Sequence, residues 1–405
     1  MDRTDAAPPP ETRSLYLIAM AVFTITVSVG ILNGLKLVQF DRAQLLTHVH
    51  AGTLGWITLG VIATSLWMLK GAVERPGSAA LRTILWSAVI SVPIFVASFA
   101  TGDLTLRAIF SWPVFAVTLG MAWWAISSVR REGLTLPRLG MLLALVSLVL
   151  GSALGVIIAS QQALDIEIIS AAAIGGHISA QVVGYLVLFA MAVTEWRLRP
   201  GAAMSRLGIA QYVIPFIGAV IGIVGATAGS NEALGAVILF ELIGVAIYTV
   251  RLGPQVLRAP WLRAEPTRHF ALAVPFLIAD LAFLILLIYG VVSGTYADFA
   301  LIPLWLIFAF DHAMFVGVVS NVLFGLVQVA TWERRAIGRW ADHVVFWGMN
   351  AGMLGFVVSL MFEQRDLERI FAPIMGTSIL VGIAVYAWRI VAPRATATRP
   401  ALQVP

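Results

Sequence analysis

Long apolar stretches alternate with short polar segments along almost the whole chain. Each stretch is roughly 20 residues long, the helical length that crosses a bilayer core of about 30 Å. The pattern predicts about twelve membrane spans, at residues 14–33, 50–69, 82–101, 108–128, 137–160, 170–193, 208–228, 233–251, 270–293, 301–323, 342–362 and 370–390. We expect an all-α, polytopic membrane bundle in one transmembrane domain, residues 14–392, with short tails at residues 1–13 and 393–405.

The composition supports this interpretation and excludes several kinds of chemistry. The 405 residues are 60% hydrophobic and 12% charged, with a mean hydropathy of +0.93, which a soluble globular domain would not tolerate. The polar, proline-rich start MDRTDAAPPPETRS does not resemble a cleavable signal peptide. Without cysteine the chain cannot hold a disulfide, a thiolate-bound copper, an iron–sulfur cluster or a thioether-linked haem.

The basic residues predict how the bundle is oriented. All but five of the 26 lysines and arginines lie in the expected tails or beside the loops that follow even-numbered spans. The five exceptions are Lys36, Arg42, Arg107, Arg365 and Arg369. By the positive-inside rule both termini are cytoplasmic, and we expect a plasma membrane, the bacterial inner membrane. The net charge of +5 therefore reflects topology and does not indicate nucleic-acid binding.

Four of the six histidines fall in the predicted outer half of the membrane. His48 and His50 start the second span, while His177 and His312 lie roughly 10 Å and 16 Å into the sixth and tenth spans. The other two histidines, His269 and His343, open spans at the cytoplasmic face, so we exclude them from the same site.

A histidine within a membrane span loses water and must find a partner, so these four are candidate ligands for haem or a metal. The alternative is that each ring only hydrogen-bonds a neighbouring helix or faces interfacial water. His48 and His50 point about 200° apart on a helix and cannot both serve one ligand. Which of the two faces the centre of the bundle remains open at this point.

Twelve spans with histidines in spans 2, 6 and 10 resemble the central subunit of the haem–copper oxidases, nearest to the cbb3-type and nitric-oxide-reductase branches. The resemblance implies that His312 and either His48 or His50 hold a b-type haem non-covalently, and that His177 faces a second metal position. The twelve-span haem- and copper-binding membrane proteins of the nitric-oxide response are similar in kind, because their second span also begins with a His-x-His pair.

The chain departs from the oxidase pattern where copper would bind. The segment after span 7, AGSNEALG, has no histidine, span 10 has only His312, and Gln181 stands where some branches place a tyrosine. Tyr185 lies one turn further on. We therefore expect about one haem per chain, sub-stoichiometric copper and no robust oxygen reductase activity.

Two further groups of charged residues are candidates for function. The resemblance implies that Arg365 and Arg369 pair with haem propionates, as forked guanidinium groups suit carboxylates. The alternative is a solvated loop in which acids already pair with these arginines. Glu241 and Asp280 lie near the middle of the membrane and mark a candidate proton route, or stay protonated as buried structural groups.

The leading functional hypothesis is a haem-binding redox protein in the lipid bilayer, which as an enzyme would be an oxidase- or nitric-oxide-reductase-type oxidoreductase. Its electrons would come from quinol or a separate cytochrome. The alternatives are a non-catalytic haem carrier or sensor, a structural assembly factor, and a secondary transporter, which twelve spans would also suit. The loop at residues 69–77 lacks the Gly-x-x-x-Asp-Arg motif common among major-facilitator transporters.

Overall fold

The computed structural model describes residues 8–69, 79–170, 172–296 and 301–393. Most of the two expected tails and of the loop at residues 69–77 lies outside these ranges. Twelve helices in the described part are long and apolar enough to cross a membrane, and no strand occurs there. The predicted all-α bundle of about twelve spans is confirmed.

Eight spans are continuous α-helices: α1 (Pro10–Gly34), α5 (Ala79–Ala100), α6 (Leu104–Glu132), α7 (Leu136–Leu164), α10 (Arg206–Ala228), α11 (Asn231–Leu257), α12 (Thr267–Val292) and α17 (Arg365–Val391). The other four contain a π-helical segment. Span 2 is α2 (Arg42–His50), η2 (Ala51–Thr58) and α3 (Leu59–Met68); span 6 is α8 (Ala173–Ile178), η3 (Ser179–Leu186) and α9 (Val187–Leu198). Span 10 is α13 (Leu304–His312), η5 (Ala313–Ser320) and α14 (Asn321–Ala330), followed by η6 (Trp332–Arg334); span 11 is α15 (Ala341–His343), η7 (Val344–Gly348) and α16 (Met349–Met361).

The second span begins earlier than its hydropathy predicts. Its helix starts at Arg42, where Asp41 and Gln44 form a reciprocal capping box. His48 and His50 therefore lie inside the helix, and the prediction that they start the span was wrong. Polar residues extend the helix beyond its apolar core, which a hydropathy pattern does not register. All four histidines now lie four to eight residues, roughly 6–12 Å, from the start of their helices.

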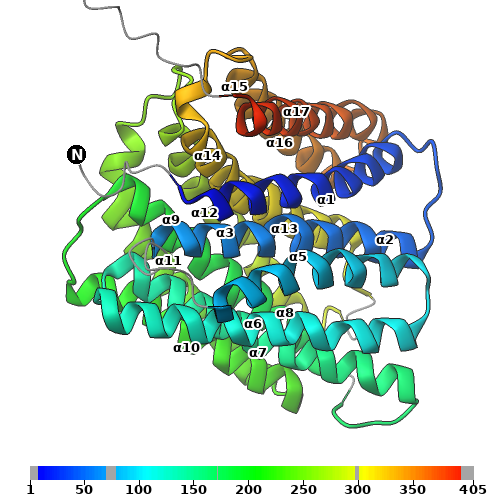
Figure 1. Cartoon of the computed structure of the whole chain (residues 1–405). Helices are drawn as coiled ribbons and strands as arrows, with labels where there is room; N and C mark the ends of the chain where they lie inside the picture. Colours follow the sequence, from blue (N-terminus) through cyan, green and yellow to red (C-terminus); the bar gives the residue numbers. More distant parts are fainter. Residues whose placement is uncertain (1–7, 70–78, 171, 297–300, 394–405) are drawn as a thin grey trace, which may run out of the picture.

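Spans 2, 6 and 10 form the centre of the bundle. Their most apolar windows are 72%, 83% and 83% buried, whereas no other span exceeds 50%. The remaining nine helices surround them, and α17 packs against α1 to join the two ends of the chain. Figure 1 shows α1 beginning, and α17 ending, at one end of the bundle. We call the opposite end, where α2, α8 and α13 begin, the histidine end.

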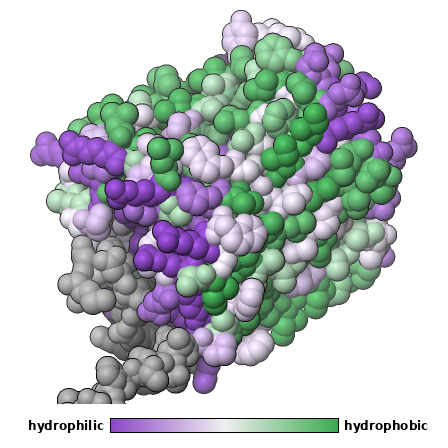
Figure 2. All heavy atoms as spheres, turned by 90° about the horizontal axis from the view of Figure 1, so that it is seen from above, coloured by the Kyte–Doolittle hydropathy of each residue, from purple (hydrophilic) through white to green (hydrophobic). Residues whose placement is uncertain are grey.

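The surface has the distribution expected of a protein that crosses a bilayer. Figure 2 shows hydrophilic residues gathered at the two ends and a largely apolar belt between them. Large side chains on the apolar helices remain exposed, including Trp86 of α5 at 67% and Trp123 of α6 at 58%. Because the belt coincides with the twelve apolar helices, the chain is a multi-pass membrane protein.

Buried ion pairs join helices at the end of the bundle away from His48, His50, His177 and His312. Arg389 of α17 binds both oxygens of Asp342 at 2.7 Å and 3.2 Å, and these side chains are 0% and 1% exposed. Arg251 of α11 pairs in the same way with buried Glu195 of α9. His269 and His343 lie in this region too: His269 bonds Asn321 at 2.9 Å and His343 contacts Arg268.

Candidate functional site

Three π-helical segments lie beside the four candidate histidines. His50 directly precedes η2, His312 directly precedes η5, and His177 lies two residues before η3. The segment η5 contacts both η2 and η3, so these irregular turns meet at the centre of the bundle. π-helical turns within α-helices often mark functional sites, because they redirect side chains from the regular spacing.

Each of the four imidazoles holds a backbone carbonyl with its Nδ1 atom. His48 and His177 reach across to the preceding span, to the carbonyls of Thr26 and Gly151, both at 2.8 Å. His50 and His312 instead bond the carbonyl four residues earlier in their own helix, at 2.7 Å and 2.8 Å. Two of the rings are thus fixed by the preceding span, and the other two are fixed by their own helix.

These bonds determine the protonation of the rings. A carbonyl oxygen only accepts, so Nδ1 carries the hydrogen and Nε2 keeps its lone pair. Nε2 makes no hydrogen bond to any described residue in the four rings, and all four rings are only half-buried. Histidines that bind metals are usually held in this way, because the bond at the second nitrogen fixes the tautomer and the direction of the ring.

The four histidines form two pairs. A charge on His48 would act on His312, and a charge on His177 would act on His50, so the two rings of each pair lie near each other. Each pair joins two central spans. Among the described residues no group of three or more histidine or acidic side chains could hold a metal ion. The four candidate histidines therefore lie as two pairs, and both pairs include a residue of span 2.

A glycine on the preceding helix faces one ring of each pair. A Cβ atom at Gly30 would lie 3.2 Å from Cε1 of His48, and one at Gly155 would lie 3.1 Å from Cε1 of His177. Each glycine is four residues after the residue whose carbonyl anchors the same ring, Thr26 or Gly151. Both rings thus rest against a bare stretch of neighbouring backbone.

Aromatic and basic side chains surround the rings. The Phe99 ring stacks on His50 with centroids 3.7 Å apart, and Phe356 lies 4.8 Å from His312. Arg107 places its guanidinium over Phe99, where its charge acts on His50. Its Nε atom is buried and has no hydrogen-bond partner among the described residues.

An internal repeat, which hydropathy alone did not reveal, relates the three central spans. Each span has an alanine followed four residues later by a glycine. The four histidines all lie either one or three residues before this alanine. The matched positions are His48, Phe310 and His177, then His50, His312 and Ser179, then Ala51, Ala313 and Ala180, then Gly55, Gly317 and Gly184. Aligning the three spans on the shared Ala-x-x-x-Gly pattern would have exposed this signal in the sequence.

Hydrogen bonds at the centre follow the same repeat. Trp56 of span 2 donates to Ser320 of span 10 at 3.0 Å, and Tyr185 of span 6 donates to Thr58 of span 2 at 3.4 Å. Trp56 and Tyr185 each directly follow the repeated glycine of their own span. The hydroxyl groups belong to Ser320 and Thr58, which each lie three residues after the repeated glycine of their own span. The two imidazole pairs join spans 2 and 10 and spans 6 and 2 in the same order.

The outer arginines lie apart from this arrangement. Arg365 and Arg369 are exposed at the start of α17, where Arg369 makes a 3.6 Å ion pair with Asp366. Glu368 faces Lys36 at 3.9 Å. These contacts fit the solvated-loop alternative for this segment, and neither arginine forms a hydrogen bond or ion pair with a candidate histidine in the described part of the chain.

The intramembrane acids lie between spans 8, 9 and 10. Glu241 and Asp280 are 1% and 2% exposed, and each has an oxygen without a partner among the described residues. A charge on Asp280 would disfavour a charge on Glu241. They line a cavity of about 10 Å³, roughly the space of one water molecule. Asp280 also interacts with Asp311, which adjoins His312. A series of acids therefore runs from mid-membrane to a candidate ligand.

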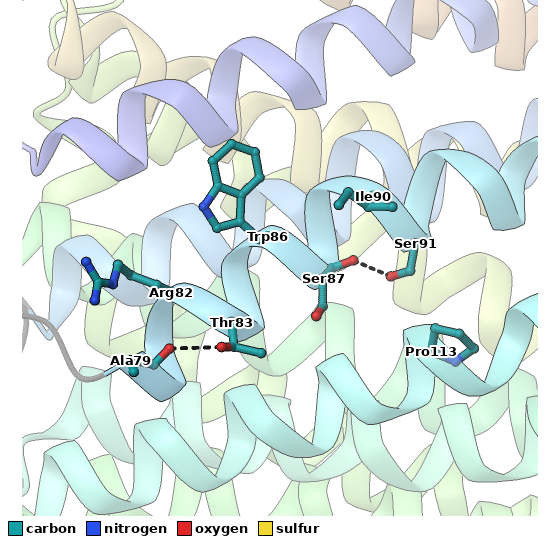
Figure 3. A pocket seen from close by; sticks show the side chains of 8 residues that line it. All are labelled: Ala79, Arg82, Thr83, Trp86, Ser87, Ile90, Ser91 and Pro113. Atoms are coloured by element: carbon teal, nitrogen blue, oxygen red, sulfur yellow. Dashed lines mark hydrogen bonds between the residues drawn. The ribbon is translucent and has the colours of Figure 1, made fainter.

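A separate groove of about 700 Å³ opens on the lipid-facing side of α5. Figure 3 shows its lining residues, Ala79, Arg82, Thr83, Trp86, Ser87, Ile90, Ser91 and Pro113. Thr83 and Ser91 donate to carbonyls of their own helix, at 3.0 Å and 2.6 Å. The groove contains no histidine, so we place the candidate site at the imidazole pairs instead.

No protein-family model matches this chain, and no curated protein matches it.

Proposed function

We propose that this chain is a haem-binding membrane redox protein that holds a b-type haem, without a covalent link, between His48 and His312. One observation carries the proposal. Two half-buried imidazoles from neighbouring central spans lie near each other, each commits Nδ1 to a carbonyl, and neither Nε2 has a hydrogen-bond partner among the described residues.

The residues fit the chemistry of such a group. His48 and His312 would hold the haem through their neutral imidazole nitrogens, which are common haem ligands in proteins. Gly30 leaves room for the His48 ring, and Phe356 adds an apolar contact beside His312. The haem would supply one-electron oxidation and reduction. The proposal selects His48 over His50 as the partner of His312.

Oxygen reduction does not follow from this arrangement. A haem held by both His48 and His312 would be suited to electron transfer and not to binding oxygen. Copper prefers several imidazole donors, and no described group offers three. The chain is thus better suited to electron transfer, or to carrying or sensing haem, than to a copper-dependent reductase. Arg365 and Arg369 remain candidate propionate ligands only if the loop rearranges.

Glu241, Asp280 and Asp311 are proposed to hold and pass protons. Buried carboxyl groups with unpartnered oxygens bind protons readily, because desolvation disfavours their charged form. The series ends beside His312, so a change of charge at the haem would be felt by these acids. Electrons would come from quinol or a separate cytochrome, with the protein in the bacterial inner membrane and both termini cytoplasmic.

A reduced-minus-oxidised spectrum of the purified protein tests the proposal. We expect Soret and α bands of a low-spin b-type haem, and His312→Ala should abolish the bands of this centre while protein remains in the membrane. His343→Ala is the matched control, because His343 is exposed at the other end of the bundle. A flat wild-type trace would refute the proposal and leave the transporter and assembly-factor hypotheses.

A further inference from the structure

We propose that His50 and His177 form a second haem site, so that the chain binds two bis-histidine haems. The inference rests on the proposed function in that both sites take the same group. The second pair lies between spans 2 and 6, which the Tyr185–Thr58 hydrogen bond joins just as the Trp56–Ser320 bond joins spans 2 and 10 at the first pair. It therefore lies on another side of span 2 from the first pair. It raises the expected haem content from one to two per chain.

The first argument is that the two pairs are built alike. Each contains one imidazole anchored across to the preceding span, His48 or His177, and one anchored within its own helix, His312 or His50. The cross-anchored ring faces a glycine four residues after its carbonyl partner in both cases. A histidine that only filled space would not need this repeated set of contacts.

The second argument is that the third equivalent position differs. Spans 10 and 6 carry Phe310 and Ser179 at the matched positions, so no imidazole pair forms there. Phe310 instead lines the small cavity that contains Glu241 and Asp280. The repeat therefore predicts two haem sites and not three. At the third interface, between spans 10 and 6, Phe310 packs beside the cavity of Glu241 and Asp280.

The surroundings of the second pair favour haem over a bare metal ion. Two imidazoles hold a metal ion weakly, and no third donor joins them in the described part of the chain. Phe99 and Phe95 provide apolar ring surface beside His50. The buried, unpartnered Nε of Arg107 lies next to this aromatic pair and offers a donor to a propionate carboxylate.

Ligand exchange tests the proposal without requiring activity. The full-length wild type should contain two haems per chain and titrate as two redox components. Exchange of histidine for methionine at a bis-histidine haem raises its potential. His177→Met should therefore raise one component, or remove one haem, while His312→Met acts on the other. His343→Met is the control and should change neither.

Arg107→Gln supplies an independent variant that leaves all four histidines in place. Loss of its positive charge should lower the potential of the component that His177→Met raises, and leave the other unchanged. Matched yields and elution volumes would exclude misfolding as the cause. One haem per chain, lost in His312→Ala but kept in His177→Ala, would overturn this proposal and leave the first site standing. A wild type without haem would overturn both.

Discussion

Replacement of Gly30 by alanine tests whether the backbone beside His48 is part of the haem site. The new Cβ would lie 3.2 Å from Cε1 of His48, whereas carbon atoms pack at about 3.5–4.0 Å. The ring would have to withdraw by roughly 0.3–0.8 Å, although its Nδ1 is held 2.8 Å from the Thr26 carbonyl. Ligands must be placed to within about 0.5 Å, so this displacement is large enough to matter.

Overpacking of this size typically costs about 1–3 kcal/mol. If that cost falls on the ligand-bound state, haem binding at this site should weaken roughly 5- to 150-fold, since 1.4 kcal/mol is about a factor of ten. The assay is a titration with haemin of protein that was produced under haem limitation. Binding is measured by the absorbance of the low-spin haem. Gly155→Ala should have the same effect on the second site, where the contact is 3.1 Å.

Gly235→Ala is the matched control, because a Cβ there meets nothing within 4 Å although the residue is also inside a helix. It corrects for the gain of about 1 kcal/mol in helix propensity that alanine brings. If Gly30→Ala and Gly155→Ala bind haem as tightly as Gly235→Ala, the glycines do not shape the sites and the reasoning is refuted.

Three further predictions concern the rest of the molecule. Asp342→Asn should destabilise the protein by about 3–5 kcal/mol, because it leaves the fully buried Arg389 without its carboxylate; an unchanged denaturation midpoint in detergent would contradict this. Glu241→Gln should weaken the pH dependence of the haem potential, measured by redox titration at several pH values, if this buried acid takes up a proton on reduction; equal slopes in variant and wild type would remove Glu241 from the route. Reporter fusions after Pro200 should be cytoplasmic and fusions after Asp165 external, and the reverse result would invert the orientation given by the basic residues.

The bundle could be predicted from sequence because membrane spans obey a simple physical requirement. Backbone groups in lipid must be hydrogen-bonded within a helix, and bilayer thickness fixes the helix length, so apolar stretches reveal the spans directly. The same pattern placed His48, His50, His177 and His312 toward one end. The start of the second helix at Arg42 was missed, because polar residues that extend a helix carry no hydropathy signal.

The pairing of the histidines was decided only by the tertiary structure. Sequence spacing established that His48 and His50 diverge, but their neighbours depend on how each central span is rotated against the others. The anchors that fix the rings include carbonyls of Thr26 and Gly151, which no side-chain pattern identifies. Span number and depth follow from local hydropathy and bilayer thickness, whereas ligand partners follow from contacts between residues far apart in the chain, which arise only when the helices pack.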